Sequence, residues 1–251
     1  MTLVSQVIDV ARAAGDAIMD IYALADHGTT VKADDSPLTL ADRAAHDCIV
    51  ERLSAVDASI PILSEEAESI PYEQRAGWKR FWLVDPLDGT KEFIKRNGEF
   101  TVNIGLIENN EPVLGVVYAP AVDLLFAAAG PGTAKRRVPG GFEPVSARCV
   151  PKEAPVIVHS RSHNNSPRIA EFAEKLPGAT RIVSGSAIKF CKLAAGEADI
   201  YPRFGPTMEW DTAAGQAILE AAGGSVSTLE GARLAYGKPE FRNAGFIARG
   251  R

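Results

Sequence analysis

The sequence predicts an α/β protein built from layered helices and sheets. The first half opens with two helical patterns and continues with a run of strands, whereas the second half alternates strands with helices. With 251 residues, 46% of them hydrophobic, the chain can bury a large core. We expect one compact unit of two halves that share an interface, residues 1–150 and 151–251, with the seam at 151–155.

Two helices are predicted at the start of the chain. Apolar residues from Val4 to Ile21 recur at helical spacing and form one buried stripe. A second helix follows the polar segment 32–42, where Thr39 and Asp42 fit a capping box. Capping and a supporting role in catalysis use the same kind of exposed helix start, so both roles stay open for Asp42.

Two predicted strands end in acidic residues. The apolar segment 60–63 precedes Glu65 and Glu66, and the apolar segment 81–84 precedes Asp85. The polar connection between them is long enough to return the second strand beside the first, so both strand ends would meet at one edge of a sheet. Paired glutamates after a strand are usually a solvated turn, and that interpretation stays open for Glu66.

The second of these strand ends has the pattern of a metal and phosphate site. In the segment 85–88, two aspartates lie three positions apart, a proline fixes the turn, and the Leu87 carbonyl is left as a further oxygen ligand. Gly89 allows close approach of the backbone, and Thr90 can begin a helix whose N–H groups bind an oxyanion. An Asp-rich turn without a metal would share this pattern.

The first half continues as a sheet. Segments 100–107 and 112–118 predict antiparallel strands joined by a turn, and 121–129 extends the sheet. The basic run 135–137 lies between two glycine-rich turns, so we interpret it as a solvated hairpin tip.

The second half alternates two kinds of element. Strands are predicted at 156–158, 181–183 and 198–201, and helices near 166–175, 187–195 and 210–222. This order is typical of a parallel or mixed sheet covered by helices.

Polar residues in the second half add candidates for a shared site. Asp211 begins a helix of small residues that can pack closely and direct the carboxylate inward, although an Asp there is by default a helix cap. Ser186 and Lys189 belong to a helix start that can bind an anion. Arg203 and His163 follow strands, where a single cation usually lies at the surface.

The composition argues against several classes of protein. A formal charge of −5 without a long basic run does not fit a dedicated nucleic-acid or membrane-surface protein. Charged residues interrupt the first helical pattern, so we expect neither a signal peptide nor a membrane span. Three cysteines without CxxC spacing are typical of free thiols. We expect a cytoplasmic protein, monomer or homodimer, with peripheral association at the inner membrane face left open.

Three separated motifs together resemble the inositol monophosphatase superfamily of magnesium-dependent, lithium-sensitive phosphatases. They are the segments 64–66, 85–90 and 210–215. Within that superfamily, Lys91, Glu92 and the segments 184–191 and 201–207 resemble the 3'(2'),5'-bisphosphate nucleotidases of the CysQ type. Inositol monophosphatases more often have a small polar residue and Asn in place of Lys91 and Glu92. The resemblance implies a five-layer αβαβα sandwich of the sugar and inositol phosphatase type.

The resemblance also implies roles for the site residues around two or three Mg²⁺ ions. The metal ligands would be Glu65, Asp85, the Leu87 carbonyl, Asp88 and Asp211. Thr90 and Asp42 would orient the attacking water and take up its proton, with assistance from Glu65. The substrate would contact Glu65, Leu87, Asp88, Gly89, Thr90, His163, Ser186, Lys189, Arg203 and Asp211. Clustered carboxylates repel one another unless cations lie between them, which agrees with such a site.

The activity that the resemblance implies is Mg²⁺-dependent hydrolysis of 3'-phosphoadenosine 5'-phosphate (PAP) to AMP and phosphate in sulfur metabolism. Its 5'-phosphosulfate (PAPS), converted to APS, would be a further substrate. The second phosphate of such a nucleotide requires cations outside the metal cluster, which Lys189 and Arg203 would supply. An inositol monophosphatase or broad sugar phosphatase stays open as an alternative. A non-catalytic nucleotide- or metal-binding protein is the alternative from another class.

Overall fold

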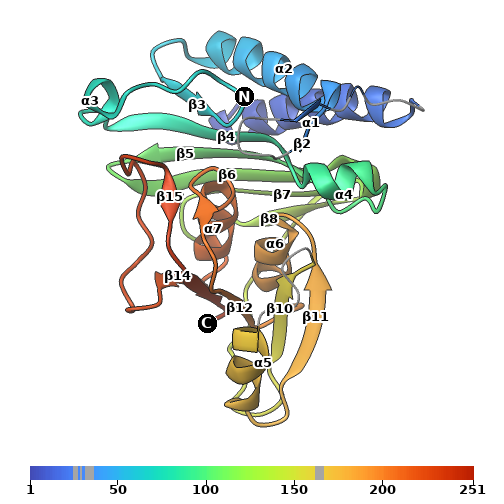
Figure 1. Ribbon diagram of the computed structural model, residues 1–251, viewed down its shortest axis with the longest axis vertical. Helices are drawn as coiled ribbons and strands as arrows, with labels where there is room; N and C mark the ends of the chain where they lie inside the picture. Colours follow the sequence, from blue (N-terminus) through green and yellow to red (C-terminus); the bar gives the residue numbers. More distant parts are fainter. Residues whose placement is uncertain (25–27, 29, 32–36, 162–166) are drawn as a thin grey trace.

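Helices and sheets alternate in five layers in the computed structural model, which describes residues 1–24, 28, 30–31, 37–161 and 167–251. Figure 1 shows, from top to bottom, a helix pair, a large sheet, a second helix pair, a smaller sheet and a single helix. The predicted αβαβα arrangement is therefore confirmed.

The layers are made of the following elements. The first helix pair is α1 (Leu3–Tyr22) and α2 (Leu40–Val56). The large sheet has the order β3 (Ile62–Ser64), β4 (Arg80–Asp88), β5 (Thr101–Glu108), β6 (Glu111–Ala119), β7 (Leu124–Ala129), β8 (Lys135–Val138) and β9 (Gly141–Pro144). The second helix pair is α6 (Ile188–Ala194) and α7 (Ala213–Ala221). The smaller sheet has the order β11 (Thr180–Ser184), β10 (Val156–Ser160), β12 (Ile200–Arg203), β16 (Phe246–Arg249) and β14 (Ser225–Thr228), and the last layer is α5 (Pro167–Glu174).

Short elements lie in the connections. They are β1 (Thr30–Val31), β2 (Pro37–Leu38), α3 (Tyr72–Arg75), α4 (Thr90–Ile94), η1 (Pro120–Val122), β13 (Thr207–Met208) and β15 (Arg242–Asn243).

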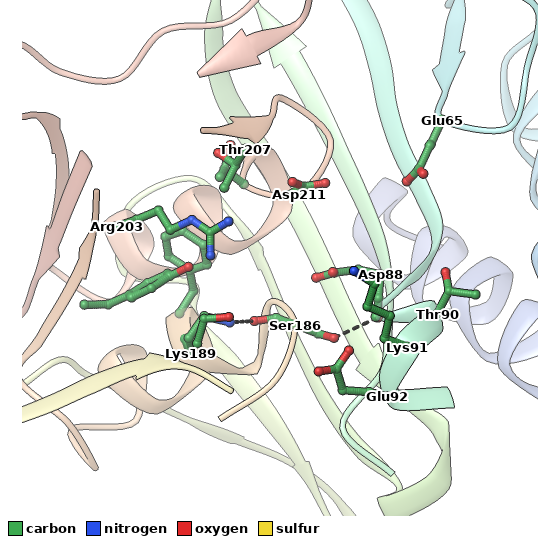
Figure 2. Close-up of a pocket in the computed structure, with 15 residues that line it drawn as sticks. Glu65, Asp88, Thr90, Lys91, Glu92, Ser186, Lys189, Arg203, Thr207 and Asp211 are labelled. Atoms are coloured by element: carbon green, nitrogen blue, oxygen red, sulfur yellow. Dashed lines mark hydrogen bonds between the residues drawn. The ribbon is translucent and has the colours of Figure 1, made fainter. Parts of the chain in front are cut away.

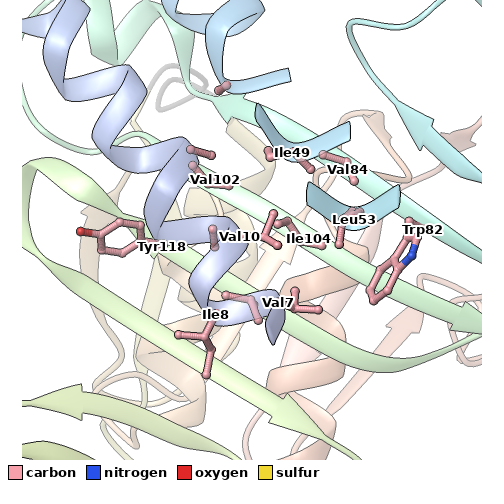
Figure 3. Close-up of a cluster of buried hydrophobic side chains, with 14 of the residues drawn as sticks. Val7, Ile8, Val10, Ile49, Leu53, Trp82, Val84, Val102, Ile104 and Tyr118 are labelled. Atoms are coloured by element: carbon pink, nitrogen blue, oxygen red, sulfur yellow. The ribbon is translucent and has the colours of Figure 1, made fainter. Parts of the chain in front are cut away.

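The two N-terminal helices cover one face of the large sheet (Figure 3). Val7 and Val10 of α1, Ile49 and Leu53 of α2, and Ile104 of β5 belong to one cluster, and each is at most 3% exposed. Burying a side chain of this size contributes about 1.5–3 kcal/mol to folding. Both predicted helices and the buried stripe of α1 are confirmed, and this core supports the strands that carry the site.

The two strands with acidic ends are neighbours, as the sequence predicts. β3 and β4 pair in parallel, with Ser64 opposite Val84. The pairing continues one residue further, because the Glu65 N–H donates to the Val84 carbonyl at 3.1 Å. Glu65 and Asp85 therefore emerge from the same edge of the large sheet.

Helix α7 packs closely on the other face of the large sheet. An added Cβ at Gly115 of β6 would lie 2.2 Å from the Ala214 carbonyl oxygen, and one at Gly105 of β5 would lie 2.9 Å from the Ala213 Cβ. Glycine in the sheet and alanine in the helix thus let the two backbones approach. This confirms the predicted role of the small residues, and it brings the turn before α7 to the large sheet.

The prediction for the basic run 135–137 is wrong. These residues form β8, which pairs with both β7 and β9, and the hairpin tip lies at 139–140. Arg136 pairs with Glu143 at 2.5 Å and with Glu197 at 3.4 Å, both near the surface. A strand close to the sheet edge accepts basic residues because their long side chains reach solvent and acidic partners.

Other differences concern strands and boundaries in the second half of the chain. β16 and β14, which no prediction included, extend the smaller sheet beyond β12, with β16 next to β12 and β14 at the edge. Both are antiparallel to their neighbours, whereas β10 is parallel to β11 and β12, so the predicted mixed sheet is confirmed. α7 begins at Ala213 rather than at Trp210.

The two sheets come from different stretches of sequence. The large sheet ends at Pro144, and the smaller one begins at Val156. The division into residues 1–150 and 151–251 stays a prediction. No helix in the part of the chain that the structure describes combines the length and the apolar character needed to cross a bilayer. Cys48, Cys149 and Cys191 are free thiols.

Candidate metal and phosphate site

Both aspartates of β4 lie on the same side of the strand because β4 contains a bulge. Asp85 pairs with Asn103 of β5 and Asp88 pairs with Thr101, so β4 has one residue more than β5 over this stretch. Residues three apart in a regular strand point to opposite faces, and the extra residue returns them to the same face. The strand thus continues beyond Val84, where the sequence predicts its end, and the predicted turn is a bulge.

Three carboxylates from distant parts of the chain converge at this bulge. Glu65, Asp85 and Asp211 each place one oxygen atom within 4.8 Å of the other two. Glu65 follows β3, and Asp211 lies in the turn before α7, where its Oδ2 accepts a hydrogen bond from the Met208 N–H at 2.9 Å. The convergence of acidic residues predicted from the sequence is present in the structure.

Burial and mutual repulsion shape the electrostatics of this cluster. Burial, followed by the charges of Glu65 and other carboxylates, raises the pKa of Asp85 well above its ordinary value. Burial and the Asp88 charge likewise raise the pKa of Asp211. Burial raises the pKa of Asp88 to about 6, although Lys189 acts in the opposite direction. Oxygen donors that repel one another fit a hard divalent cation, so the cluster could bind a metal ion.

Asp42 makes both of the contacts that its two possible roles require. Its Oδ2 accepts hydrogen bonds from the Thr39 N–H at 2.7 Å and the Thr39 hydroxyl at 2.6 Å, which completes the capping box of α2. Its Oδ1 accepts a hydrogen bond from the Thr90 hydroxyl at 3.2 Å. Thr90 is the first residue of α4 and follows Gly89, whose φ of 97° suits glycine. One carboxylate therefore joins the start of α2 to the start of α4, which directly follows β4.

A cavity of about 240 Å³ opens in front of the acidic cluster. Figure 2 shows Glu65 and Asp88 on one side of it and Lys189 and Arg203 on the other, with Asp211 between them. The lining contains Glu65, Asp88, Gly89, Thr90, Lys91, Glu92, Ser160, Ser186, Lys189, Phe190, Tyr201, Arg203, Thr207, Asp211 and Thr212. Cations thus face a metal-binding cluster across one cavity, an arrangement suited to a ligand with separated negative charges.

Comparison with known proteins identifies the family. A model of the inositol monophosphatase family matches residues 2–248, nearly the whole chain. The chain belongs to the inositol monophosphatase family. It is therefore an enzyme of a phosphatase family, and a small-molecule phosphate substrate agrees with this membership.

Relatives within the family include several proteins named 3'(2'),5'-bisphosphate nucleotidase CysQ. The protein from Salmonella typhimurium is 49% identical over 246 residues, which covers 97% of this chain and 98% of the relative. The protein from Escherichia coli strain K12 is 46% identical with the same coverage. The crystal structure of CysQ from Bacteroides thetaiotaomicron, a bacterial member of the inositol monophosphatase family, superposes with a TM-score of 0.87 at 42% identity and covers 98% of this chain and 96% of that one.

Lys189 and Arg203, the cations that face the acidic cluster across the cavity, differ in their surroundings. Lys189 is 4% exposed, and its Nζ donates to the Ser186 carbonyl at 2.5 Å. Burial lowers the pKa of Lys189 to about 8, while the Asp88 charge acts in the opposite direction. Arg203 donates from Nη2 to the Pro206 carbonyl at 3.1 Å, and its buried Nε has no partner among the described residues. Arg203 thus has donors available for a ligand.

Ser186 connects the two halves of the chain. Its hydroxyl lies 2.7 Å from the Asp88 carbonyl and 2.7 Å from the Glu99 carbonyl, so it can donate to either. Glu99 also accepts a hydrogen bond from the Gly185 N–H at 2.9 Å and pairs with Arg161 at 2.7 Å. Ser186 lines the cavity, as a substrate contact must, but its hydroxyl primarily fixes the α6 side of the cavity to the β4 bulge.

Two of the predicted site residues, His163 and Leu87, have no side chain that the structure places in the cavity. His163 lies outside the described residues, so its predicted contact with substrate stays a prediction. The Leu87 side chain is 3% exposed and belongs to the hydrophobic core, which leaves the main-chain carbonyl as the group that could serve the site. Asp85 lies in the acidic cluster and Asp42 behind Thr90, and the remaining predicted residues line the cavity.

Sequence reasoning assigned no site role to one buried and one half-buried polar residue. Asn103 is fully buried, and its Nδ2 donates to Asp88 Oδ2 at 3.4 Å. His46 lies one turn after Asp42 on α2, and its Nδ1 lies 2.8 Å from the Ser64 hydroxyl, next to Glu65 in sequence. A polar residue inside the apolar segment 100–107 was the available signal for Asn103. No comparable signal marks His46, because a histidine within a helix is common.

Proposed function

We propose that this enzyme is a Mg²⁺-dependent 3'(2'),5'-bisphosphate nucleotidase that hydrolyses PAP to AMP and phosphate and accepts PAPS as a second substrate. The observation that carries the proposal is the cavity in which Lys189 and Arg203 face the carboxylates of Glu65 and Asp211. The names of the CysQ relatives support it. The three free thiols fit a reducing, cytoplasmic location.

Carboxylate oxygens are the ligands that Mg²⁺ prefers. The cluster supplies them from β4, from the turn after β3 and from the turn before α7. Glu65, Asp85, Asp88, Asp211 and the Leu87 carbonyl would bind two or three ions. When bound there, Mg²⁺ would supply charge stabilisation for the phosphate and the leaving oxygen and would lower the pKa of a coordinated water. Hydrolysis of this kind would need no covalent enzyme intermediate, because water would attack the phosphate directly.

Thr90 and Asp42 would orient the attacking water. The Thr90 hydroxyl donates a hydrogen bond to Asp42 Oδ1 at 3.2 Å, which leaves the Thr90 oxygen to accept a hydrogen bond from the water. Asp42 is 1% exposed and is fixed by Thr39, so the Thr90 hydroxyl has one preferred direction. Fixed geometry of this kind aligns a nucleophile and the group that takes up its proton. The N–H groups at the start of α4 would contact the transferred phosphate.

The substrate's second phosphate would lie near Lys189 and Arg203. Both are on the opposite side of the cavity from Glu65 (Figure 2). A second cavity of about 360 Å³ shares Ser160 and Arg203 with the first and is lined by Phe204 among others. It offers room for the nucleoside beside the phosphate-binding groups. An inositol phosphate would leave both cations without an anionic partner.

Substrate preference tests this proposal. We expect phosphate release in Mg²⁺ to show a much higher kcat/KM for PAP than for inositol 1-phosphate. Replacing Arg203 by Met should lower kcat/KM for PAP by about 30-fold, equivalent to ~2 kcal/mol for lost charge-assisted hydrogen bonds. The inositol phosphate value should change less than about threefold, because that ligand has no second phosphate.

The matched control is Arg80→Met, at the opposite end of β4 from the site. Arg80 is exposed and pairs with Glu108 at 2.9 Å, a surface contact of small energy. It should leave both kcat/KM values unchanged. Equal losses for both substrates in Arg203→Met would contradict the proposed role of Arg203. Binding of PAP without phosphate release would favour a non-catalytic binder.

A further inference from the structure

The side chain of Arg75 is buried between two distant segments of the chain. It lies in α3, in the connection that leads from Glu65 to β4, and is 5% exposed. Its Nε donates to the Ile70 carbonyl at 3.1 Å, within the same connection. Its Nη1 donates to the Lys238 carbonyl at 2.9 Å, and its Nη2 donates to the Pro239 carbonyl. One guanidinium group therefore ties this connection to the segment before β15.

The guanidinium group of Arg75 also lies over one ring of an aromatic pair, and that pair leads to the acidic cluster. Its guanidinium carbon lies 3.6 Å from the ring centroid of Phe241. The Phe241 ring lies 5.3 Å from that of Trp210, the residue directly before Asp211. Cation–π contacts at this range are strongest when they are desolvated, as this one is. Three groups in contact, Arg75, Phe241 and Trp210, thus connect α3 to the turn that carries Asp211.

A second connection reaches the same turn through Glu209. Its carboxylate is fully buried and accepts hydrogen bonds from the Gly237 N–H at 2.8 Å and the Lys238 N–H at 3.0 Å. Lys238 Nζ pairs with the same carboxylate at 2.8 Å. The Glu209 N–H in turn donates to the Phe241 carbonyl at 2.7 Å. The segment 237–241, which Arg75 anchors, therefore fixes both residues that precede Asp211.

The role of Arg75 is geometric rather than one of charge neutralisation. Within the described residues, no carboxylate forms an ion pair with it, and its donors go to main-chain carbonyls. Burying an arginine costs folding free energy unless the donors of its planar guanidinium group are hydrogen-bonded. The carbonyls around Arg75 therefore fit a guanidinium group in particular. One of these carbonyls, that of Ile70, belongs to the connection that follows Glu65. The other two, of Lys238 and Pro239, belong to the segment that contacts the residues before Asp211. Figure 1 shows α3 beside the end of the large sheet that the C-terminal segment before β15 also reaches.

We propose that Arg75 is a positioning residue for the metal site: it sets the distance between Glu65 and Asp211, and thereby the affinity for a divalent cation. The inference rests on the metal-binding part of the proposed function. It does not depend on which phosphate ester is the substrate. Removal of groups that orient metal ligands typically weakens metal affinity by about 10–100-fold.

Titration with Mn²⁺ alone, followed by calorimetry or by the EPR signal of free Mn²⁺, tests the proposal. We expect Arg75→Met, which keeps the aliphatic stem, to weaken Mn²⁺ binding by at least about tenfold. Arg75→Lys keeps the charge but loses the fork, so it should recover little affinity. In steady state, the half-saturating Mg²⁺ concentration should rise by a similar factor, while kcat at saturating Mg²⁺ should change less than about threefold.

Arg148→Met is the matched control for lost stability. Arg148 also satisfies a buried partner, pairing with Asp199 at 2.7 Å, but it lies in the connection between the two sheets and pairs with none of the acidic cluster. We expect it to lower the melting temperature and leave the Mn²⁺ affinity unchanged. An Arg75→Met variant that is folded, less stable and unchanged in Mn²⁺ affinity would overturn the proposal.

Two further outcomes are distinguishable. If Arg75→Met does not fold, Phe241→Leu removes only the aromatic face, and unchanged Mn²⁺ affinity in that variant would overturn the proposal instead. Wild-type protein that binds Mn²⁺ but does not hydrolyse PAP would contradict the proposed function and leave the role of Arg75 intact. Wild-type protein that binds no Mn²⁺ would contradict both.

Discussion

At the scale of single residues, Asp42 shows how one carboxylate can serve a fold and a site together. Its Oδ2 completes the capping box with Thr39, and its Oδ1 accepts the Thr90 hydroxyl. The cap fixes the carboxylate on α2, so the second oxygen points in a defined direction. From the sequence, capping and catalytic support are competing interpretations. The geometry contains both contacts because the two oxygens of a carboxylate are independent acceptors.

The Asp42–Thr90 pair leads to a prediction about catalysis. Asp42→Asn and Thr90→Val should each lower kcat by at least about 100-fold, because the attacking water loses its orienting group. The double variant should be no slower than the worse single one, since the two groups act as a unit. Single-turnover rates at saturating Mg²⁺ measure these effects.

Thr39→Ala serves as the control for the capping role of Asp42. It removes one hydroxyl of the capping box and should cost about 1 kcal/mol of folding stability. Its rate at saturating substrate should stay within about threefold of wild type, because the Thr39 N–H still donates to Asp42 Oδ2 and fixes that carboxylate. Additive losses of kcat in Asp42→Asn and Thr90→Val would show that the two residues act separately.

At the scale of elements, two packing features set the position of the acidic residues. The bulge in β4 turns Asp85 and Asp88 to one face. The close approach of α7 to β5 and β6 at Gly105 and Gly115 places Asp211 beside them. The approach of α7 involves no side chain of the acidic cluster, whereas inside the bulge the Leu87 N–H donates to Asp85 Oδ1 at 3.0 Å. The site is therefore sensitive to substitutions that touch no ligand.

Gly115→Ala tests the importance of this approach. The new Cβ would overlap the Ala214 carbonyl oxygen, so α7 must shift away from β6. Overpacking of this kind typically costs about 1–3 kcal/mol of folding stability. We expect Mn²⁺ affinity to fall as well, because Asp211 precedes α7. Denaturant unfolding and Mn²⁺ titration measure the two effects.

The control for Gly115→Ala is Gly77→Ala, since a Cβ there meets nothing within 4 Å. This variant should be neutral or slightly more stable, as expected when a glycine in an ordinary conformation is replaced. A Gly115→Ala protein with wild-type Mn²⁺ affinity would indicate that the turn with Asp211 moves independently of α7.

At the scale of the whole molecule, an ion pair between exposed Arg148 and buried Asp199 fastens the segment between the two sheets. Arg148 donates to both oxygens of Asp199. The Oδ2 atom also accepts a hydrogen bond from the Val156 N–H at 2.7 Å. Asp199 directly precedes β12 and is fully buried. Burial alone would raise the pKa of Asp199, but these hydrogen bonds lower it below its ordinary value. The ionised form is thus preferred in the folded protein.

This pair predicts a stability that depends on pH. Because the folded-state pKa of Asp199 is depressed, its stabilising contribution is complete above the ordinary Asp pKa of 3.8 and is lost as pH falls through the folded-state value. Asp199→Asn should therefore cost about 1–3 kcal/mol of unfolding free energy at pH 7. The difference from wild type should shrink in acid. Urea unfolding at several pH values measures it, and a constant difference down to pH 3 would contradict the assignment.

Much of the fold follows from local sequence patterns. The stripe from Val4 to Ile21 predicts α1, and the capping box at Thr39 marks the start of α2. These features are encoded in residues close together in the chain, where periodicity and caps act. The short strands β14 and β16 escaped prediction because four-residue segments carry little periodic signal, and only the pairing of β16 with β12 and of β14 with β16 makes them strands.

The sequence by itself determined which residue types the site contains: acidic strand ends at Glu65 and Asp85, an acidic helix start at Asp211, and cations at Lys189 and Arg203. The tertiary structure alone decided their geometry. It uses the Ser186 hydroxyl to connect two halves, the bulge to turn Asp88, and Arg75 to tie α3 to the segment before β15. The physical reason is that contacts between residues so far apart in the chain form only when packing of the whole molecule offsets the entropy of bringing them together.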